Sequence, residues 1–359
     1  MKTSILHIAP RNTAGVPWTI VKEERRRGFD SWLLTFRPHP FGFGQDETLN
    51  LPFIDDPLTT TVQRLLSTTP KKINIRREYS ELPPKWQGNK FPTSLLFAMR
   101  DRIWKSKLKQ AGFPKRLADF DIIVLDGGLP LLRNGKWIST WAKATGKLAT
   151  VYYGTDLRQH GVIDEIDRFS DAVFVLEFDH IALHPRAKWL PFPFDADSVP
   201  PADLPTSGPI RIGHVASNRA TKSTDAIIAA IEAVSERFDV EPVIIENVPH
   251  NETLRLKSTC HIFVDQLGEL GYGISGLESL AMGIPTIIEL LPDHEDFIGE
   301  HPFITADDDS LSYILQELIL DEPKRLEIAS AGKKWVREFH RPSRAVDVMH
   351  ERYSELKWL

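Results

Sequence analysis

GYGISGLESLAMGIP, residues 271–285, is the stretch of this sequence that says most about the fold. It follows an apolar run at 261–265 and leads into a predicted helix at 275–282, so backbone amides at the turn can face a phosphate or a sugar hydroxyl. The turn and the helix start carry three glycines, which let the backbone approach a ligand closely. These glycines are Gly271, Gly273 and Gly276. The segment therefore predicts a strand–turn–helix unit with a ligand-binding turn.

Two other interpretations fit the same letters. Ser275 and Glu278 have the spacing of a capping box, in which both side chains bind free amides at a helix start. The three glycines also match the dinucleotide fingerprint, and Glu289 ends the next apolar run about where a ribose-binding acid would lie. Against a dinucleotide site, the glycines lie deep in the second half of the chain and the helix is short. An NAD(P)-dependent dehydrogenase using Gly271, Gly273 and Gly276 stays an alternative.

Outward from this segment, the apolar runs predict an α/β protein with two domains. Short, continuous apolar runs are typical of strands buried in a parallel sheet, and they recur on both sides of a proline-rich break. A chain of 359 residues is long enough for two such cores. We expect an N-terminal domain over 1–193, a linker over 194–209, a C-terminal domain over 210–340, and a C-terminal helix over 341–359 that is free to pack back on the N-terminal domain.

The expected elements follow the same periodicities. In the N-terminal domain they are strands over 4–9, 31–36, 121–126, 148–153 and 171–176, a helix that ends near 27, loops with short elements over 40–92, and a basic helix over 93–111. In the C-terminal domain they are strands over 210–215, 242–246, 261–265 and 285–289, helices over 223–237, 251–257 and 275–282, and three closing helices, of which the last begins near 343.

The 271–285 segment resembles the donor-site signature of GT-B glycosyltransferases of the family-four type. Three further segments are similar to that family: 152–158, 214–224 and 261–267. The resemblance implies two Rossmann-like domains whose parallel sheets face a central cleft, with a nucleotide-diphosphate sugar bound by the C-terminal domain and a saccharide or lipid-linked acceptor by the N-terminal domain. It also implies hexosyl transfer with retention, in which the leaving phosphate helps to take the acceptor proton, in the synthesis of envelope polysaccharide or glycolipid.

The resemblance also assigns roles at the donor site. Glu278 is expected to hold the nucleotide ribose, while Gly271, Tyr272 and Gly273 lie against the donor sugar and diphosphate. Many members carry a glutamate directly before the first glycine, where this chain has Leu270, with Glu269 one step off. Subfamilies without that acid carry an aspartate–glutamine pair like Asp265-Gln266. Because Leu270 stands where many members have that glutamate, a catalytically silent GT-B sugar-binding protein is a second alternative.

Two cations follow the first strand of the C-terminal domain. Arg219 and Lys222 lie in a loop at the edge of the sheet where α/β proteins present ligands. Fixed cations there would stabilise the charge left on the diphosphate without a metal, which is how the family uses an arginine and a lysine. A basic helix start on the surface is the alternative. From the N-terminal domain, the Gly15 turn is expected to admit the phosphates.

Two acids follow strands of the N-terminal domain. Asp156, in the segment YGTDLR, would line the acceptor side of the site, although it could instead cap a helix. Asp126 precedes two glycines and could orient the acceptor hydroxyl, although a turn residue is an equal alternative. His214 and His250 rank lower, because an isolated histidine near a strand end is more often a packed core residue.

Composition limits the class of protein. The first residues form too short an apolar run for a secretory signal, and no segment has the apolar length of a membrane span. The single cysteine, Cys260, excludes an intrachain disulfide and fits a reducing cytosol. Acidic and histidine side chains show no metal-ligand spacing. We therefore expect a cytoplasmic protein with no tightly bound metal or cofactor.

The net charge of -5 hides a basic region over residues 64–116, where fourteen cationic side chains face three anionic ones and give a local charge of +11. One interpretation is a solvated face of helices. The other is peripheral contact with an anionic membrane or a polyanionic acceptor, to which Trp86 and Trp104 would contribute. Nucleic acid is a weaker candidate partner, because no recognition motif supports it.

Overall fold

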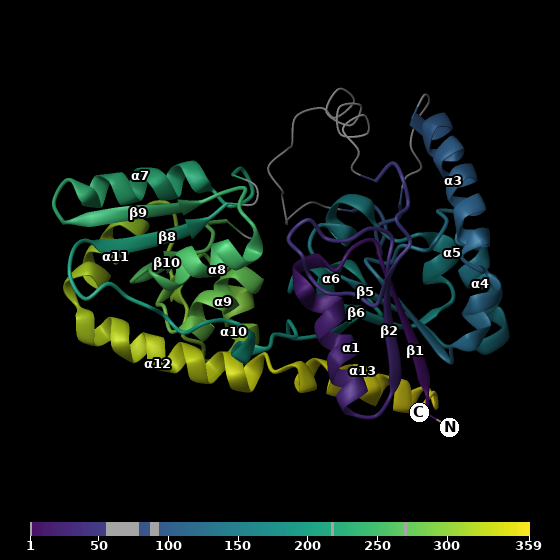
Figure 1. The fold of residues 1–359 in the computed structure, drawn as a ribbon. Coiled ribbons are helices and arrows are strands. Elements are labelled where there is room, and N and C mark those ends of the chain that lie inside the picture. The colour runs from purple at the N-terminus through teal and green to yellow at the C-terminus, as the bar shows by residue number, and fades with distance from the viewer. Residues whose placement is uncertain (1, 55–78, 87–92, 217–218, 269–270) are drawn as a thin grey trace. The chain divides into compact units, whose positions relative to one another are not determined.

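The computed structural model of the chain describes residues 2–54, 79–86, 93–216, 219–268 and 271–359. These residues form two compact units (Figure 1). Unit 1 contains the described residues up to Pro191 together with Ala345–Leu359, and unit 2 contains Phe192–Arg344. Each unit has its own parallel sheet with helices packed against it.

The sheet of unit 1 has the order β3-β2-β1-β4-β5-β6-β7, and all its strands pair in parallel. Its strands are β1 (Ser4–Ala9), β2 (Asp30–Thr35), β3 (Glu47–Thr48), β4 (Ile122–Asp126), β5 (Leu148–Tyr152), β6 (Ser170–Val175) and β7 (Lys188–Trp189). The chain builds outward from β1 in one direction and from β4 in the other. The order therefore reverses between β1 and β4, as in the doubly wound fold of dinucleotide-binding proteins.

Helices of unit 1 follow most of its strands. They are α1 (Val16–Arg26), α3 (Thr93–Gln110), α4 (Lys136–Thr145), α5 (Asp164–Asp167), α6 (His180–Leu183) and, from Ala345 on, α13 (Pro342–Glu355), with short helical turns η1 (Thr13–Gly15), η2 (Lys115–Asp119) and η3 (Asp156–His160). Helix α1 begins after Gly15, whose φ of 76° suits glycine, and Pro17 lies in its first turn. Glycines in the same conformation, Gly135 and Gly146, flank α4.

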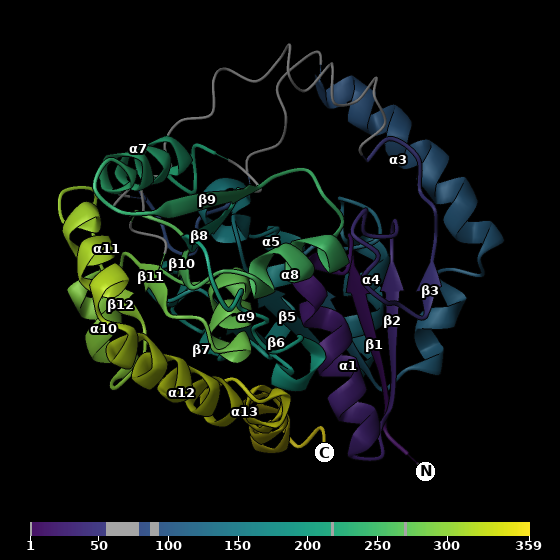
Figure 2. The ribbon, with the colours of Figure 1, turned by 60° about the vertical axis from the view of Figure 1, so that its left-hand side comes forward.

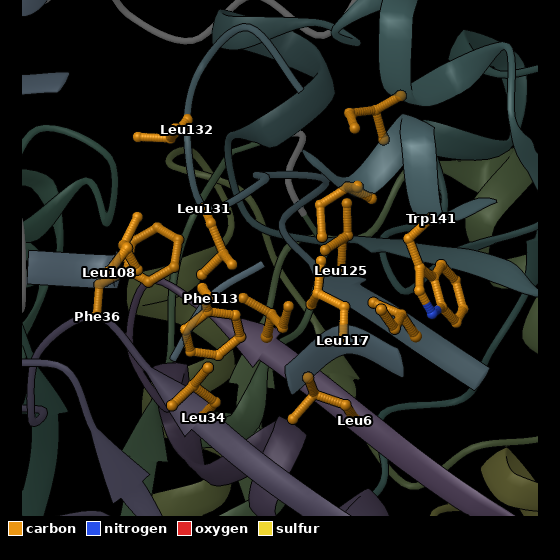
Figure 3. Close-up of a cluster of buried hydrophobic side chains, with 14 of the residues drawn as sticks. Leu6, Leu34, Phe36, Leu108, Phe113, Leu117, Leu125, Leu131, Leu132 and Trp141 are labelled. Atoms are coloured by element: carbon orange, nitrogen blue, oxygen red, sulfur yellow. The ribbon is translucent and has the colours of Figure 1, made fainter. Parts of the chain in front are cut away.

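One hydrophobic core of unit 1 lies between the sheet and the helices α3 and α4 (Figure 3). The strands contribute Leu6, Leu34 and Leu125, and the helices contribute Leu108 and Trp141. A fully buried leucine contributes roughly 1.5–3 kcal/mol to stability. This packing fixes the carboxyl ends of the central strands, where the loops begin.

The C-terminal helix α13 packs beside α1 in unit 1 (Figure 2). Arg27 forms an ion pair with Asp347 at 2.8 Å. The ring of Phe29 meets the ring of His350 edge to face, with their centroids 4.6 Å apart. The last segment of the chain thus completes the fold of the unit that contains its first strand.

The sheet of unit 2 has the order β12-β11-β10-β8-β9, again with parallel pairing. Its strands are β8 (Ile210–Val215), β9 (Val240–Ile245), β10 (Ile262–Val264), β11 (Thr286–Ile288) and β12 (Ile304–Thr305). The order reverses between β8 and β10, which is the flavodoxin-like variant of the doubly wound sheet.

Helices α7 and α11 cover one core of unit 2, where Ile227 and Ile231 of α7 and Leu315 of α11 pack on Ile212 and Val264 of the sheet. The helices of the unit are α7 (Thr224–Ser235), α8 (His250–Ser258), α9 (Ile274–Met282), α10 (Pro292–Ile298), α11 (Leu311–Leu320) and α12 (Glu322–Phe339), with the helical turn η4 (Ala196–Ser198).

The α/β fold with two parallel sheets confirms the fold class predicted from the sequence. The prediction of three closing helices was wrong, because four helices, α10 to α13, follow β11. Helix α10 is about two turns long and gives little periodicity to detect. Most of the predicted loop region 40–92 lies outside the described residues, and its described part contains the short strand β3.

Candidate donor and acceptor sites

The carboxyl ends of β8 and β10 form the point in unit 2 where ligands bind in folds of this kind. The two strands are neighbours, with Gly213 opposite Phe263. The chain leaves β8 toward β9 on one side, and β10 leads toward β11 on the other. Loops that diverge in this way leave room between them at the carboxyl edge of a parallel sheet.

An ion pair joins the two loops at this point. Lys222 Nζ, in the loop after β8, lies 2.6 Å from Asp265 Oδ1, directly after β10. The lysine side chain is 15% exposed and the aspartate is buried. Asp265 Oδ2 has no hydrogen-bond partner among the described residues. The sequence predicted Lys222 as a site residue, and the structure adds Asp265 as its partner.

Asp265 also explains Gly276. A methyl group at Gly276 would approach Asp265 Oδ2 to 3.0 Å, which is tighter than nine in ten real contacts of a Cβ atom. Gly276 therefore allows the first turn of α9 to lie against the carboxylate. This role is separate from the dinucleotide fingerprint, in which the third glycine serves close packing between helix and strand.

The capping-box interpretation of Ser275 and Glu278 was wrong. Helix α9 begins at Ile274 with Gly273 as its N-cap, so Ser275 already lies inside the first turn. No side chain of the described residues caps this end. The amide groups of the first turn, which carry the positive end of the helix dipole, are available to an anion.

Glu278 is instead bound by two side chains of α8. Its Oε2 accepts a hydrogen bond from Lys257 Nζ at 2.7 Å, and its Oε1 lies 2.6 Å from His250 Nε2. Lys257 is fully buried and also donates to the carbonyl and the hydroxyl of Ser275. Burial alone would raise the pKa of Glu278, but Lys257 and His250 outweigh it and hold the pKa below its ordinary value. Glu278 is therefore an ionised, paired carboxylate, and its contact with ribose stays a prediction.

Arg219 lies in the same loop as Lys222 but binds different partners. Its guanidinium pairs with Asp225 at 2.7 Å and with Glu246 at 2.9 Å, and its side chain is half exposed. The two positions before it, Ser217 and Asn218, lie outside the described residues. Both cations therefore lie in the loop after β8, but they pair with different carboxylates. The role of Arg219 at a diphosphate stays a prediction.

The glycine turn before α9 packs inside unit 2. Tyr272 is buried in a cluster of aromatic rings that includes Phe303 and His294, and burial raises its pKa. Gly271 has a φ of 74°, and Gln266 Nε2 donates to its carbonyl. Ligand contacts of Gly271, Tyr272 and Gly273 stay predictions, and Leu270 and Glu269 lie outside the described residues.

The geometry does not fit the dinucleotide alternative. In that fingerprint the glycines form the tight turn that joins the first strand directly to its helix. Here the whole segment from Asp265 to Gly273 separates β10 from α9, and β10 is not the first strand of its unit. Glu289, the expected ribose acid, accepts a hydrogen bond from the backbone amide of Gly268 at 2.5 Å.

In unit 1 the corresponding reversal point lies between β1 and β4. Gly15 follows β1 and starts α1, where a side chain would meet the ring of Phe43 at 3.5 Å. Asp126 ends β4, is buried, and lies 3.2 Å from His7 Nδ1. The other nitrogen of His7 lies 3.1 Å from Glu24. Phosphate binding by Gly15 and acceptor orientation by Asp126 stay predictions.

This buried triad holds a charge inside the unit. Burial alone would lower the pKa of His7, but the carboxylates of Glu24 and Asp126 outweigh it and raise the pKa to about 10. Burial likewise acts to raise the pKa of Glu24, and His7 and His350 overcome it and lower the pKa to about 2. For Asp126 burial prevails, and its pKa is raised.

Two further acids lie at the ends of β5 and β6. Asp156 Oδ2 accepts from the amide of Tyr153 at 3.0 Å, and Glu177 Oε1 accepts from the amide of Gly154 at 2.6 Å. Burial raises the pKa of each acid to about 7. The helix-cap alternative for Asp156 was wrong, because its side chain makes no cap contact and binds an amide before the turn η3 instead. Carboxyl groups with shifted pKa values at a sheet edge are typical of functional sites.

Glu177 and Lys257 were missed by the sequence reasoning. Glu177 follows an apolar strand as one of several acids in that region, and Lys257 reads as an ordinary surface lysine of a helix. The available signal was position alone: Glu177 follows the end of a strand, where ligands bind. His7 gave a clearer signal, since a polar residue inside the continuous apolar run 4–9 needs a buried partner.

Among the described residues, no three or more His, Cys, Asp or Glu side chains gather in a way that could hold a metal ion. Within the same part of the chain, no helix has both the length and the apolar character needed to cross a bilayer. His214 lies inside unit 2, where it contacts the carbonyl of Val264 and the hydroxyl of Thr224. It is therefore a packed residue of the sheet.

Comparison with known proteins gives structural relatives. No family model matches the sequence, and no curated protein matches it. Sucrose-phosphate synthase from Thermosynechococcus elongatus is similar with a TM-score of 0.60, 12% identity and coverage of 99% of both chains. HepE from Anabaena in complex with UDP and glucose has a TM-score of 0.57 and 12% identity over 98% of this chain and 100% of its own. WaaG, a glycosyltransferase involved in lipopolysaccharide biosynthesis, has a TM-score of 0.51 and 12% identity over 96% and 99%. The chain has the GT-B fold of glycosyltransferases.

Proposed function

We propose that this chain is a glycosyltransferase that moves a sugar from a nucleotide-diphosphate sugar to a saccharide or lipid-linked acceptor. The observation that carries the proposal is the ion pair of Lys222 and Asp265 beside the start of α9, which no side chain of the described residues caps. A cation and a helix N-terminus together suit the diphosphate of a nucleotide. The fold supports the proposal, since the similar structures include one with bound UDP and glucose.

Lys222 supplies the charge that the reaction needs. When the bond between the sugar and the phosphate breaks, negative charge develops on the leaving diphosphate, and a fixed cation lowers the energy of that transition state. Asp265 balances the positive charge of the lysine. Binding of the diphosphate would let Lys222 face two anionic partners. Arg219 would add a second cation by leaving its two surface carboxylates.

Unit 1 would bind the acceptor at the carboxyl ends of β4, β5 and β6. Asp156 and Glu177 can each accept a hydrogen bond from a sugar hydroxyl, and with pKa values near 7 a protonated form can donate one. Because the sequence resembles the family-four enzymes, we propose that the transferred sugar retains its anomeric configuration. In that mechanism the leaving phosphate helps to take the proton of the acceptor hydroxyl.

Helix α3 supports peripheral contact with an anionic membrane surface, at the inner face of the membrane in a cytoplasmic protein. Leu95, Met99 and Ile103 lie four residues apart and form a stripe that is 41–59% exposed. Exposed cations flank it on the same helix: Arg102, Lys105, Lys107 and Lys109. The expectation that Trp104 contributes to this surface was wrong, because its side chain is buried and faces the core with Leu108. An apolar stripe between lysines and arginines is typical of helices that lie in a membrane interface.

A panel of nucleotide sugars tests the function. The purified chain should hydrolyse or transfer sugar from at least one donor, slowly in the absence of an acceptor, and release of the nucleoside diphosphate would report it. A protein that binds a nucleotide sugar without turning it over would instead be a catalytically silent sugar-binding protein. Absence of both binding and turnover across UDP, GDP and ADP sugars would contradict the proposal.

A further inference from the structure

Two tryptophans and an arginine line one edge of unit 1, where helix α1 lies beside strand β2 (Figure 1). The guanidinium carbon of Arg25 lies 5.4 Å from the ring centroid of Trp18 and 5.8 Å from that of Trp32. Trp32 is 44% exposed, and the side chain of Arg25 is 36% exposed. A cation between two indole rings joins them into one surface, here called the aromatic strip.

Hydrogen bonds hold the outer part of the aromatic strip in place. Arg25 Nε donates to the carbonyl of Ser31 at 2.7 Å, and its Nη2 pairs with Asp46 at 2.6 Å. The indole nitrogen of Trp32 donates to Asp30 at 3.1 Å. Ordering long surface side chains costs conformational entropy, so a surface whose side chains are already held binds a ligand more readily.

Trp18 is fixed by the loop that follows β2. A side-chain carbon at Gly44 would approach Trp18 Nε1 to 2.8 Å, so glycine lets the loop lie against the indole. Asn12, which is buried, donates to the carbonyl of Gly44 at 2.7 Å and accepts from the amide of Trp18 at 3.4 Å. Because Trp18 lies in the first turn of α1 after Gly15, the aromatic strip begins at the carboxyl edge of the sheet.

The sheet leaves the outer end of the aromatic strip uncovered. β3 pairs with the last two residues of β2, so among the described residues no strand covers β2 at Trp32. Asp30 binds the indole of Trp32, and Asp46 binds the arginine beside it. With two acids and one arginine around the ring, the strip lacks the excess of positive charge that attracts a polyanion.

We propose that the aromatic strip binds a neutral saccharide chain. The C–H groups on one face of a sugar ring form an apolar surface that stacks on an indole, while its hydroxyls bind charged groups at the rim. Trp32 supplies the ring, and Asp30, Arg25 and Asp46 supply the rim. The surface continues past the guanidinium to Trp18, which favours a chain over a single sugar. This site goes beyond the proposed function, which requires only the sugars that react.

Native electrophoresis in gels that contain dextran, soluble starch or a β-glucan tests the proposal. At least one of these neutral polysaccharides should retard the wild-type chain. Trp32→Ala should bind it about tenfold more weakly, as expected when one stacking contact is lost, and Trp32→Phe, which keeps a ring, should bind at an intermediate level. Tyr313→Ala, at an aromatic residue of α11 that is 61% exposed, is the matched control and should migrate like the wild type.

Equal retardation of Trp32→Ala and the wild type would overturn the proposal, and so would a wild-type chain that none of the polysaccharides retards. Retardation by heparin or DNA alone would assign the strip to a polyanion and overturn it as well. Because Trp32 lies at the surface, urea unfolding should give Trp32→Ala nearly the wild-type stability. Its release of nucleoside diphosphate from a nucleotide sugar should also match the wild type, so loss of saccharide binding leaves the proposed function intact.

Discussion

The ammonium nitrogen of Lys222 lies 2.6 Å from Oδ1 of Asp265, and this ion pair spans the reversal point of the unit 2 sheet. The pairing gives the ammonium group of the lysine a fixed place. It also means that removing the lysine leaves a buried aspartate without its partner. Activity and stability must therefore be separated when the lysine is tested.

Lys222→Gln should lower turnover of the nucleotide sugar by about 100- to 1000-fold, because it removes a cation from the developing charge of the transition state. The single variant should also lose stability, since breaking a buried ion pair costs about 3–5 kcal/mol. The double variant Lys222→Gln with Asp265→Asn removes both charges together. It should regain stability in urea unfolding and stay inactive.

A lysine elsewhere in unit 2 serves as the control for this prediction. Lys324 of α12 is partly exposed and lies 3.6 Å from Glu317. Lys324→Gln should leave both turnover and stability near the wild-type values. A stable double variant with normal turnover would remove Lys222 from the mechanism.

Glu278→Gln should destabilise the chain by about 3–5 kcal/mol, because Lys257 would remain as a buried cation without its anion. Replacement of both residues by apolar ones, Lys257→Met with Glu278→Leu, should recover much of that loss. Unfolding in urea measures the free energy of each variant. Equal stability of Glu278→Gln and the wild type would show that the pair contributes nothing to the fold.

Stability of unit 1 should depend on pH through Asp156 and Glu177. Burial raises the pKa of both acids to about 7, so between pH 4.5 and 7 the folded chain binds more protons than the unfolded chain. Their contribution is therefore full below the unfolded pKa and is lost as pH rises through 7, at up to about 1.4 kcal/mol per pH unit for each proton.

The variants Glu177→Gln and Asp156→Asn isolate this effect. Each should gain stability relative to the wild type as pH rises from 5 to 8, because an amide has no proton to lose. Thermal unfolding across that range gives the difference at each pH. A constant difference between variant and wild type would contradict the raised pKa of that acid.

Met99→Glu should weaken sedimentation with vesicles that contain anionic lipid by roughly tenfold, because it places a charge in the apolar stripe of α3. Binding of the wild type should also fall as salt rises, since the flanking cations contribute through long-range attraction. Leu320→Glu, at a more exposed leucine of unit 2, is the matched control and should bind like the wild type. Equal binding by all three chains would contradict a membrane role for the stripe, and binding to DNA instead would indicate a nucleic-acid partner.

The sequence was sufficient for the architecture because strands in a parallel sheet are buried on both faces and read as continuous apolar runs. β1 and β8 were placed at their observed bounds, and β5 within a residue of its bounds. The short helix α10 was not predicted, because about two helical turns give too little hydrophobic periodicity to detect.

Side-chain partners were beyond the sequence, because the residues that meet are far apart along the chain. The sequence singled out Lys222 but not Lys257, and only the tertiary structure pairs one with Asp265 and the other with Glu278. The letters of 271–285 determined that a strand, a glycine turn and a helix follow one another. The folded chain decided that Glu278 neither caps that helix nor meets solvent, since its carboxylate is buried beside Lys257 and His250.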